Sequence, residues 1–203
     1  MPNILTPQQP YTFSKIFDLK IEADELVAEF GYTLQRTALN LPQYSGELDR
    51  LEELRSRIQE VLPYVSLVNE TARREVLISR VVLELVHYTK AQLRIEYPIK
   101  VTEQLQGYLD YLIRTTTELL VIEAKREDLD YGFTQLAAEM IALDQWEKTP
   151  EQAILLGVVT TGKIWQFGRL NRARKHIDQG LEQYRVPEDL DSVMRILVAA
   201  LST

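Results

Sequence analysis

The segment GYLDYLIRTTTELLVIEAK, residues 107–125, decides the fold prediction, because it contains two apolar stretches that both carry charge. Asp110 lies inside the first stretch, and the second ends in Glu123-Ala124-Lys125. A buried charge costs several kcal/mol unless it is paired, hydrogen-bonded or bound to a metal. These charges therefore either neutralise one another or form a site.

The two apolar stretches predict a pair of strands at 105–113 and 118–125, joined as an antiparallel hairpin. Successive side chains of a strand point to opposite faces of the sheet. Glu123 and Lys125 therefore share one face, whereas Ala124 points to the other.

The register of this hairpin determines where Asp110 lies. A turn that pairs Ile113 with Glu118 places Asp110 opposite Val121, on the face that Glu123 occupies. A slip of two residues places Asp110 directly opposite Glu123, and a slip of one residue moves it to the other face. The turn carries no strong turn signal, so the sequence leaves the register open.

Two carboxylates and an ammonium group on one face can form a metal site at the strand end. Neighbouring carboxylates repel each other, and a divalent cation relieves that repulsion. Mg²⁺ suits such a site, because it takes oxygen ligands and keeps several waters beside one or two carboxylates. The predicted ligands are Asp110, Glu123 and the backbone carbonyl of Ala124. Lys125 is predicted to orient or help deprotonate the attacking water, or to stabilise charge on a phosphate.

The competing interpretation of these residues is a cross-strand salt bridge at a sheet edge. Exposed ion pairs of that kind are common and contribute only about 0–1 kcal/mol. We favour the site, because the order of the surrounding elements agrees with it.

The spacing of the charged residues resembles the motif of the PD-(D/E)xK nuclease superfamily. Twelve residues separate Asp110 from Glu123-Ala124-Lys125, and the motif places an aspartate on one strand and (D/E)-x-K on the next. Many members follow it with a helix that carries QxxxY. Here Gln135 matches the glutamine, but Glu139 stands where the tyrosine would be.

Two further segments resemble the nuclease domain of type I restriction motor subunits. NETARREVLISRVVLEL (69–85) is similar to the first helix of that domain, and GVVTTGKIWQF (157–167) to its late hairpin. The resemblance covers about residues 69–170, includes no helicase motor and leaves residues 1–68 unmatched. It implies a restriction-endonuclease-like fold, a Mg²⁺ or Mn²⁺ cofactor and DNA as substrate. It also implies catalytic roles for Gln135 and Glu70.

Glu70 has two rivals on the same predicted helix. Glu84 falls near the same face and Glu75 nearer its flank, so the sequence leaves this assignment open. An acid in the first turn of a helix is also favoured by the helix dipole alone.

The densest basic cluster of the chain follows the late hairpin, in GRLNRARKH (168–176). Such a run is usually a solvated surface. In a chain of net charge −7, it is also the best candidate for contacts with a nucleic-acid backbone. The predicted contact residues are Arg169, Arg172, Arg174 and Lys175.

Periodicity along the chain predicts an α/β fold, a mixed sheet flanked by helices with an α-rich N-terminal extension. The expected domains are a mainly helical extension at 1–68 and a nuclease-like core at 69–203. The expected strands, besides the hairpin, are 16–21, 32–41, 94–101, 153–160 and 164–170. The expected helices are 23–31, 46–62, 70–89, 133–143 and 188–201.

Composition bounds the function without naming it. The chain has 203 residues, 45% of them hydrophobic, and no cysteine, which excludes disulfides and thiolate metal sites. No apolar run is long enough to span a bilayer, and the first residues do not resemble a signal peptide. We expect a cytoplasmic protein without a membrane partner, acting as a homodimer or within a larger restriction-type complex.

Two other functions stay open at this point. The chain can be a catalytically weak or inactive binding module of a restriction or mobile-element system, which the absent tyrosine, the absent motor and the acidic balance favour. It can also be a structural protein in which the motif is coincidental.

Overall fold

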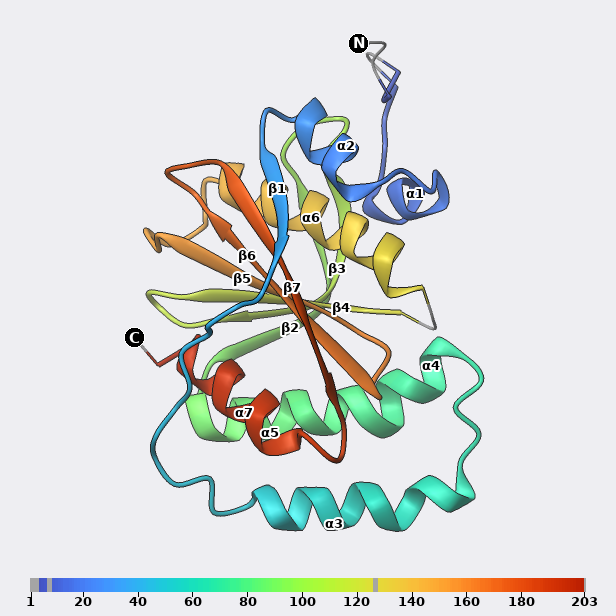
Figure 1. Ribbon diagram of the computed structural model, residues 1–203, viewed down its shortest axis with the longest axis vertical. Coiled ribbons are helices and arrows are strands. Elements are labelled where there is room, and N and C mark those ends of the chain that lie inside the picture. The colour runs from blue at the N-terminus through green and yellow to red at the C-terminus, as the bar shows by residue number, and fades with distance from the viewer. Residues whose placement is uncertain (1–3, 7–8, 126–127, 203) are drawn as a thin grey trace.

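A computed structural model describes residues 4–6, 9–125 and 128–202, and expectations that fall on residues 1–3, 7–8, 126–127 and 203 lie outside it. One seven-stranded mixed sheet runs through the molecule in the order β1-β7-β6-β5-β4-β3-β2 (Figure 1). The predicted α/β class with a mixed sheet is confirmed. The strands are β1 Thr33–Thr37, β2 Gln92–Lys100, β3 Gln106–Arg114, β4 Leu119–Ala124, β5 Ile154–Thr160, β6 Ile164–Asn171 and β7 His176–Arg185.

Helices cover both faces of the sheet (Figure 1). One face carries α1 (Phe13–Asp18), α2 (Ala23–Glu29) and α6 (Leu129–Gln145), whose side chains share one buried cluster. The other carries α3 (Leu51–Val61), α5 (Ser79–Thr89) and α7 (Leu190–Ala199), which share a second cluster. The short helix α4 (Glu70–Arg73) leads through a π-helical turn, η2 (Arg74–Ile78), into α5, and η1 (Leu62–Tyr64) follows α3.

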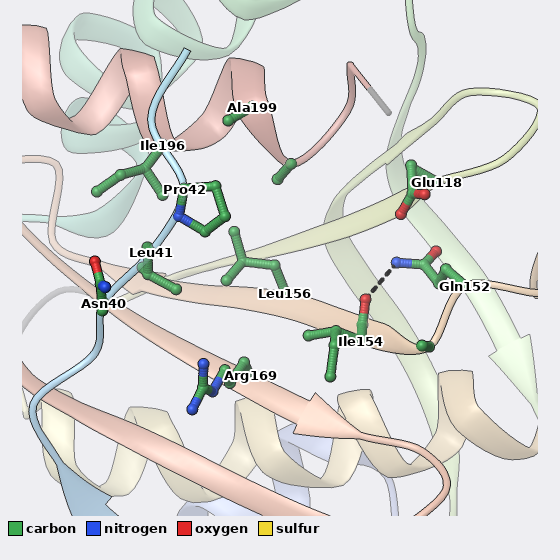
Figure 2. Close-up of a pocket in the computed structure, with 12 residues that line it drawn as sticks. Asn40, Leu41, Pro42, Glu118, Gln152, Ile154, Leu156, Arg169, Ile196 and Ala199 are labelled. Atoms are coloured by element: carbon green, nitrogen blue, oxygen red, sulfur yellow. Dashed lines mark hydrogen bonds between the residues drawn. The ribbon is translucent and has the colours of Figure 1, made fainter. Parts of the chain in front are cut away.

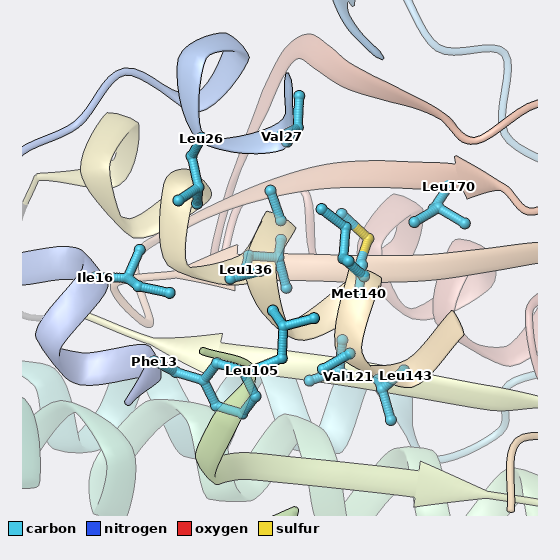
Figure 3. Close-up of a cluster of buried hydrophobic side chains, with 14 of the residues drawn as sticks. Phe13, Ile16, Leu26, Val27, Leu105, Val121, Leu136, Met140, Leu143 and Leu170 are labelled. Carbon is cyan, nitrogen blue, oxygen red and sulfur yellow. The ribbon is translucent and has the colours of Figure 1, made fainter. Parts of the chain in front are cut away.

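The face of the sheet that α6 covers is closed to solvent, because α6 is buried along most of its length. Figure 3 shows Phe13 and Ile16 of α1 and Leu26 of α2 converging on the same cluster as Leu136 and Met140 of α6. Each of these five side chains is fully buried. The N-terminal helices therefore complete the core on this face.

The β3–β4 hairpin has the register in which Asp110 lies opposite Glu123. Tyr111 pairs with Ile122 in the ladder, so the next residue pair outward is Asp110 and Glu123. This is the register reached by the two-residue slip. Thr115 closes the turn, since its side chain accepts a hydrogen bond from a backbone N–H three residues further on, at 2.9 Å.

Strand β4 continues through α6 into β5, which pairs with β4 in parallel. The crossover lays the first turns of α6 across the C-terminal end of β4. A Cβ on Gly132 of α6 would lie 2.9 Å from both Lys125 Cγ and Val159 Cγ2. Glycine is therefore required for this approach of helix and sheet.

Strand β1 pairs in parallel with β7, Thr33 beside His176 and Thr37 beside Gly180. The region 1–68 thus supplies an edge strand to the same sheet that residues 92–185 build. The helix predictions at 23–31 and 70–89 are confirmed, and Asn69 caps the second by accepting from Ala72 N–H at 2.7 Å.

One expectation about elements is wrong, and one strand was missed. Residues 16–21 are not a strand: α1 occupies 13–18, and Thr12 caps it by accepting from Lys15 N–H at 3.2 Å. Strand β7 was not predicted, because Asp178 and Gly180 are residue types that strands disfavour.

The helices of the described residues were compared with the length that a bilayer requires. No helix within residues 4–6, 9–125 and 128–202 is long and apolar enough to cross a bilayer.

Candidate active site

The C-terminal end of β4 buries the two charged residues of its motif under α6. Glu123 is 2% exposed and Lys125 is 9% exposed. Lys125 Nζ lies 2.6 Å from Glu123 Oε1, and the Lys125 backbone N–H donates to Thr160 O at 2.7 Å. Glu123 and Lys125 form a buried ion pair, so the interpretation as an exposed salt bridge does not describe them.

Gln135 joins both charges from the first turns of α6. Its Oε1 accepts from Lys125 Nζ at 2.8 Å, and its Nε2 donates to Glu123 Oε1 at 2.7 Å. The amide is thereby fixed in one orientation, with its oxygen toward the ammonium and its nitrogen toward the carboxylate. The structure places Gln135 beside Glu123 and Lys125, the two motif residues with which the resemblance groups it.

Glu139 is a member of this cluster that the sequence did not identify. It is 0% exposed, and its Oε1 accepts from Gln135 Nε2 at 2.9 Å. Its spacing of four residues from Gln135 places both on one helical face. That spacing was a usable signal, but an i, i+4 polar pair on a helix is more often solvated.

Asp110 lies on β3, and its side chain links this strand to the C-terminal end of β4. Its Oδ2 accepts from Ala124 N–H at 2.9 Å, and its Oδ1 lies 3.5 Å from Arg74 Nη1. Arg74 opens the π-helical turn, a distortion found frequently at functional sites. The Arg74 guanidinium also lies 5.4 Å from the Tyr111 ring.

Glu70 lines a cavity of about 570 Å³ that also exposes Lys125 and Gln135. Burial raises the pKa of Glu70, and Asp110 contributes in the same direction, while Lys125 and Arg74 oppose it. The rival Glu84 instead lies 3.2 Å from Arg50. Geometry thus brings Glu70, and not Glu84, into the neighbourhood of the motif.

Burial governs protonation in this cluster. It raises the pKa of Glu123 to about 7, and the neighbouring Asp110 adds to the effect. It also raises the pKa of Glu139 well above its ordinary value, with Glu123 adding to it. Burial alone would lower the pKa of Lys125, but Glu123 and Glu139 outweigh it and the pKa rises. Lys125 therefore stays an ammonium at neutral pH.

The donor set suits a hard divalent cation. Glu123 Oε2 and Glu139 Oε2 are both buried, and the raised pKa of Glu139 lets its carboxyl group donate a hydrogen bond to Glu123. Within the described residues, no group of three or more His, Cys, Asp or Glu side chains is placed to hold a metal ion. An ion would therefore depend on Asp110, Glu123, the Ala124 carbonyl and water, a set that Mg²⁺ accepts.

The basic cluster is not near this site. β6 runs away from Ala124, so by strand rise Arg169 lies about 13 Å and the turn after it about 20 Å from the Ala124 end of the sheet. Arg169 Nε donates to Asp178 Oδ2 at 2.8 Å and Arg172 Nε to Asp144 Oδ1 at 2.7 Å. Those two guanidinium groups serve internal ion pairs, whereas Arg174 and Lys175 are exposed.

Arg169 instead borders a second cavity of about 440 Å³ (Figure 2). Most of its lining is apolar, from Leu41, Leu156 and Ile196 among others. Gln152 bridges its edge, donating to Ile154 O at 2.8 Å. This cavity shares no residue with the one beside Lys125.

Comparison with known proteins adds no relative. The chain matches no protein-family model, and no curated protein matches it. The function is therefore argued from the geometry of the site.

Proposed function

We propose that the chain is a divalent-metal-dependent nuclease of restriction-endonuclease-like fold that hydrolyses DNA phosphodiester bonds. The observation that carries the proposal is the buried Glu123–Lys125–Gln135 network with Asp110 opposite Glu123. A salt bridge needs no such burial and no bridging amide. Perturbed ionisable groups gathered beside a cavity are typical of catalytic sites.

In this proposal Asp110, Glu123 and the Ala124 carbonyl would hold Mg²⁺ or Mn²⁺. The ion supplies Lewis acidity, lowering the pKa of water and offsetting phosphate charge. Lys125 donates hydrogen bonds, because its raised pKa keeps it charged; it orients water or stabilises charge on the phosphate and is not the base. Gln135 holds Lys125 and Glu123 at a fixed separation. The products are expected to be a 3′ hydroxyl and a 5′ phosphate.

Cleavage of plasmid and single-stranded DNA in Mg²⁺ or Mn²⁺ tests the proposal. We expect Lys125→Ala and Glu123→Ala each to lower the rate by roughly 100-fold or more. Lys148→Ala is the matched control, since Lys148 is exposed beyond the far end of α6. Equal cleavage by all four proteins would assign the activity to a contaminant and refute the proposal.

A second function is favoured by one observation. Both oxygens of Asp110 already have partners, Ala124 N–H and Arg74, which is how an inactive site that keeps the fold would look. The alternative is a nucleic-acid-binding module of a larger assembly. Calorimetric titration with Mg²⁺ separates the two when combined with the cleavage assay: metal or DNA binding without hydrolysis supports the module.

A further inference from the structure

The cavity beside Lys125 is walled by the N-terminal segment that resembles no known family. Helix α1 packs against α6 (Figure 1), and Thr134 Oγ1 donates to Ile21 O at 3.1 Å. On one side the cavity is lined by Phe17, Asp18 and Lys20, and on the other by Lys125, Gln135 and Glu70. Its volume of about 570 Å³ lies in the range of small-molecule sites.

An aromatic ring and two ammonium groups meet in this cavity. The Phe17 ring is half-buried, with Lys125 Nζ 4.6 Å and Lys20 Nζ 3.9 Å from its centroid. Lys20 Nζ also lies 4.6 Å from the Tyr131 ring. Both ammonium groups lie over the ring, and the Lys20 side chain is exposed, so a base that stacks on Phe17 takes the place of the Lys20 ammonium group.

The acidic groups of the lining decide which part of a nucleotide enters. Asp18, Asp128 and Glu70 outnumber Lys20 and Lys125, so the cavity would repel a second phosphate. Carboxylates accept hydrogen bonds from the N–H groups of bases. The lining therefore suits a base, and leaves Lys125 at its inner side for the phosphate.

We propose that this cavity receives one unpaired base of a single-stranded segment, stacked on Phe17, with the adjoining phosphate at Lys125. The inference rests on the proposed function and specifies its substrate as single-stranded nucleic acid. A paired base has both faces covered by its neighbours in the duplex, and extruding it costs free energy. Duplex DNA would therefore bind less well.

Fluorescence anisotropy without divalent metal tests this inference apart from catalysis. Three labelled probes are compared: a short single strand, the same strand in a duplex, and the same strand carrying abasic sites, which keeps the phosphates and removes bases. We expect the intact single strand to bind at least roughly ten-fold more tightly than either other probe. Equal affinity for the intact and abasic strands would overturn the inference, and this comparison needs no variant.

Variants assign the effect to Phe17. Phe17→Leu keeps an apolar side chain without a stacking face, and should weaken binding of the intact strand roughly ten-fold while leaving the abasic strand unchanged. Phe17→Tyr should retain the parental affinity. Tyr64→Leu is the control, because Tyr64 is an exposed aromatic residue outside the cavity lining. An intact-strand affinity that Phe17→Leu leaves unchanged, in a variant that melts cooperatively, would overturn the assignment.

The two proposals fail in different ways. Base-dependent binding that requires Phe17, without hydrolysis in Mg²⁺ or Mn²⁺, would remove the nuclease and keep the base site. Lys125-dependent cleavage of duplex DNA, without any base-dependent binding of single strands, would keep the nuclease and overturn the base site.

Discussion

The carboxyl group of Glu123 is almost fully buried, and its protonation is therefore linked to folding. Burial raises its pKa to about 7 from an ordinary value of 4.5, so between these values the folded protein binds more protons than the unfolded one. Stability from this group is fully present below the unfolded pKa and is lost as the pH rises through the folded pKa.

We predict that the melting temperature of the metal-free protein decreases as the pH is raised from about 5 to about 8. Glu123→Gln should make this slope shallower without abolishing it, because the amide does not titrate whereas Glu139, whose pKa burial also raises, still does. Differential scanning calorimetry in EDTA measures it. Glu188→Gln, at an exposed site before α7, should keep the parental slope, and a parental midpoint that rises over this interval would contradict the prediction.

A divalent cation should act on the same carboxyl in the opposite sense. At pH 8 we expect saturating Mg²⁺ to raise the unfolding midpoint, because an ion that binds only the folded state stabilises it. Glu123→Gln should remove that increase, and EDTA should reverse it in the parent. Thermal melts at graded Mg²⁺ make the measurement; an equal shift in parent and variant would place the ion elsewhere.

The sequence located these side chains better than it described their surroundings. Strand alternation put Glu123 and Lys125 on one face and left the register of Asp110 open, and the resemblance implied the role of Gln135. Glu139 was missed because helical spacing alone does not say whether a polar residue is solvated, and burial of α6 comes from the N-terminal helices that pack on it.

Helix and sheet approach closely where α6 crosses the end of β4, at Gly132. Alanine is normally favoured over glycine inside a helix by about 1 kcal/mol. Here its Cβ would lie 2.9 Å from Lys125 Cγ and Val159 Cγ2. We predict that Gly132→Ala destabilises the protein by about 1–3 kcal/mol and slows any cleavage, since Lys125 must move.

Urea unfolding of Gly132→Ala gives the change in free energy. Ser56→Ala, at an exposed site inside α3, is the control for a simple gain in helix propensity. A Gly132→Ala protein as stable as its parent would mean that α6 does not depend on close contact with β4.

Element type followed from the sequence where local signals were strong and failed where tertiary contacts decide. The helix at 70–89 carries an N-cap and an apolar stripe, and it was found. Strand β7 carries buried Asp178 and Gln179, which are stabilised by partners in neighbouring strands: Arg169 donates to Asp178 and Arg36 to Gln179. Those partners lie on other strands, so the local sequence of β7 does not reveal them.

The whole molecule depends on its first 68 residues. They supply β1 to the sheet and bury Phe13, Ile16 and Leu26 against the α6 face. We predict that a fragment of residues 69–203 aggregates, because its β7 edge and its apolar α6 face are both uncovered. Size-exclusion chromatography and circular dichroism measure this.

Co-expression with residues 1–68 is the control for that truncation. The two pieces should associate and restore cooperative unfolding, since the missing surface is then supplied. A monodisperse, cooperatively unfolding 69–203 fragment would show that residues 1–68 form a dispensable extension.

The parallel pairing of β1 with β7 also sets a timetable for biosynthesis. Thr33 pairs with His176, so β1 cannot pair with β7 until more than two-thirds of the chain has been synthesised. Until then the early segment has an unmatched backbone edge, which is the condition in which nascent chains recruit chaperones. Slowing translation late in the message should therefore lengthen that exposure and lower the yield of native protein.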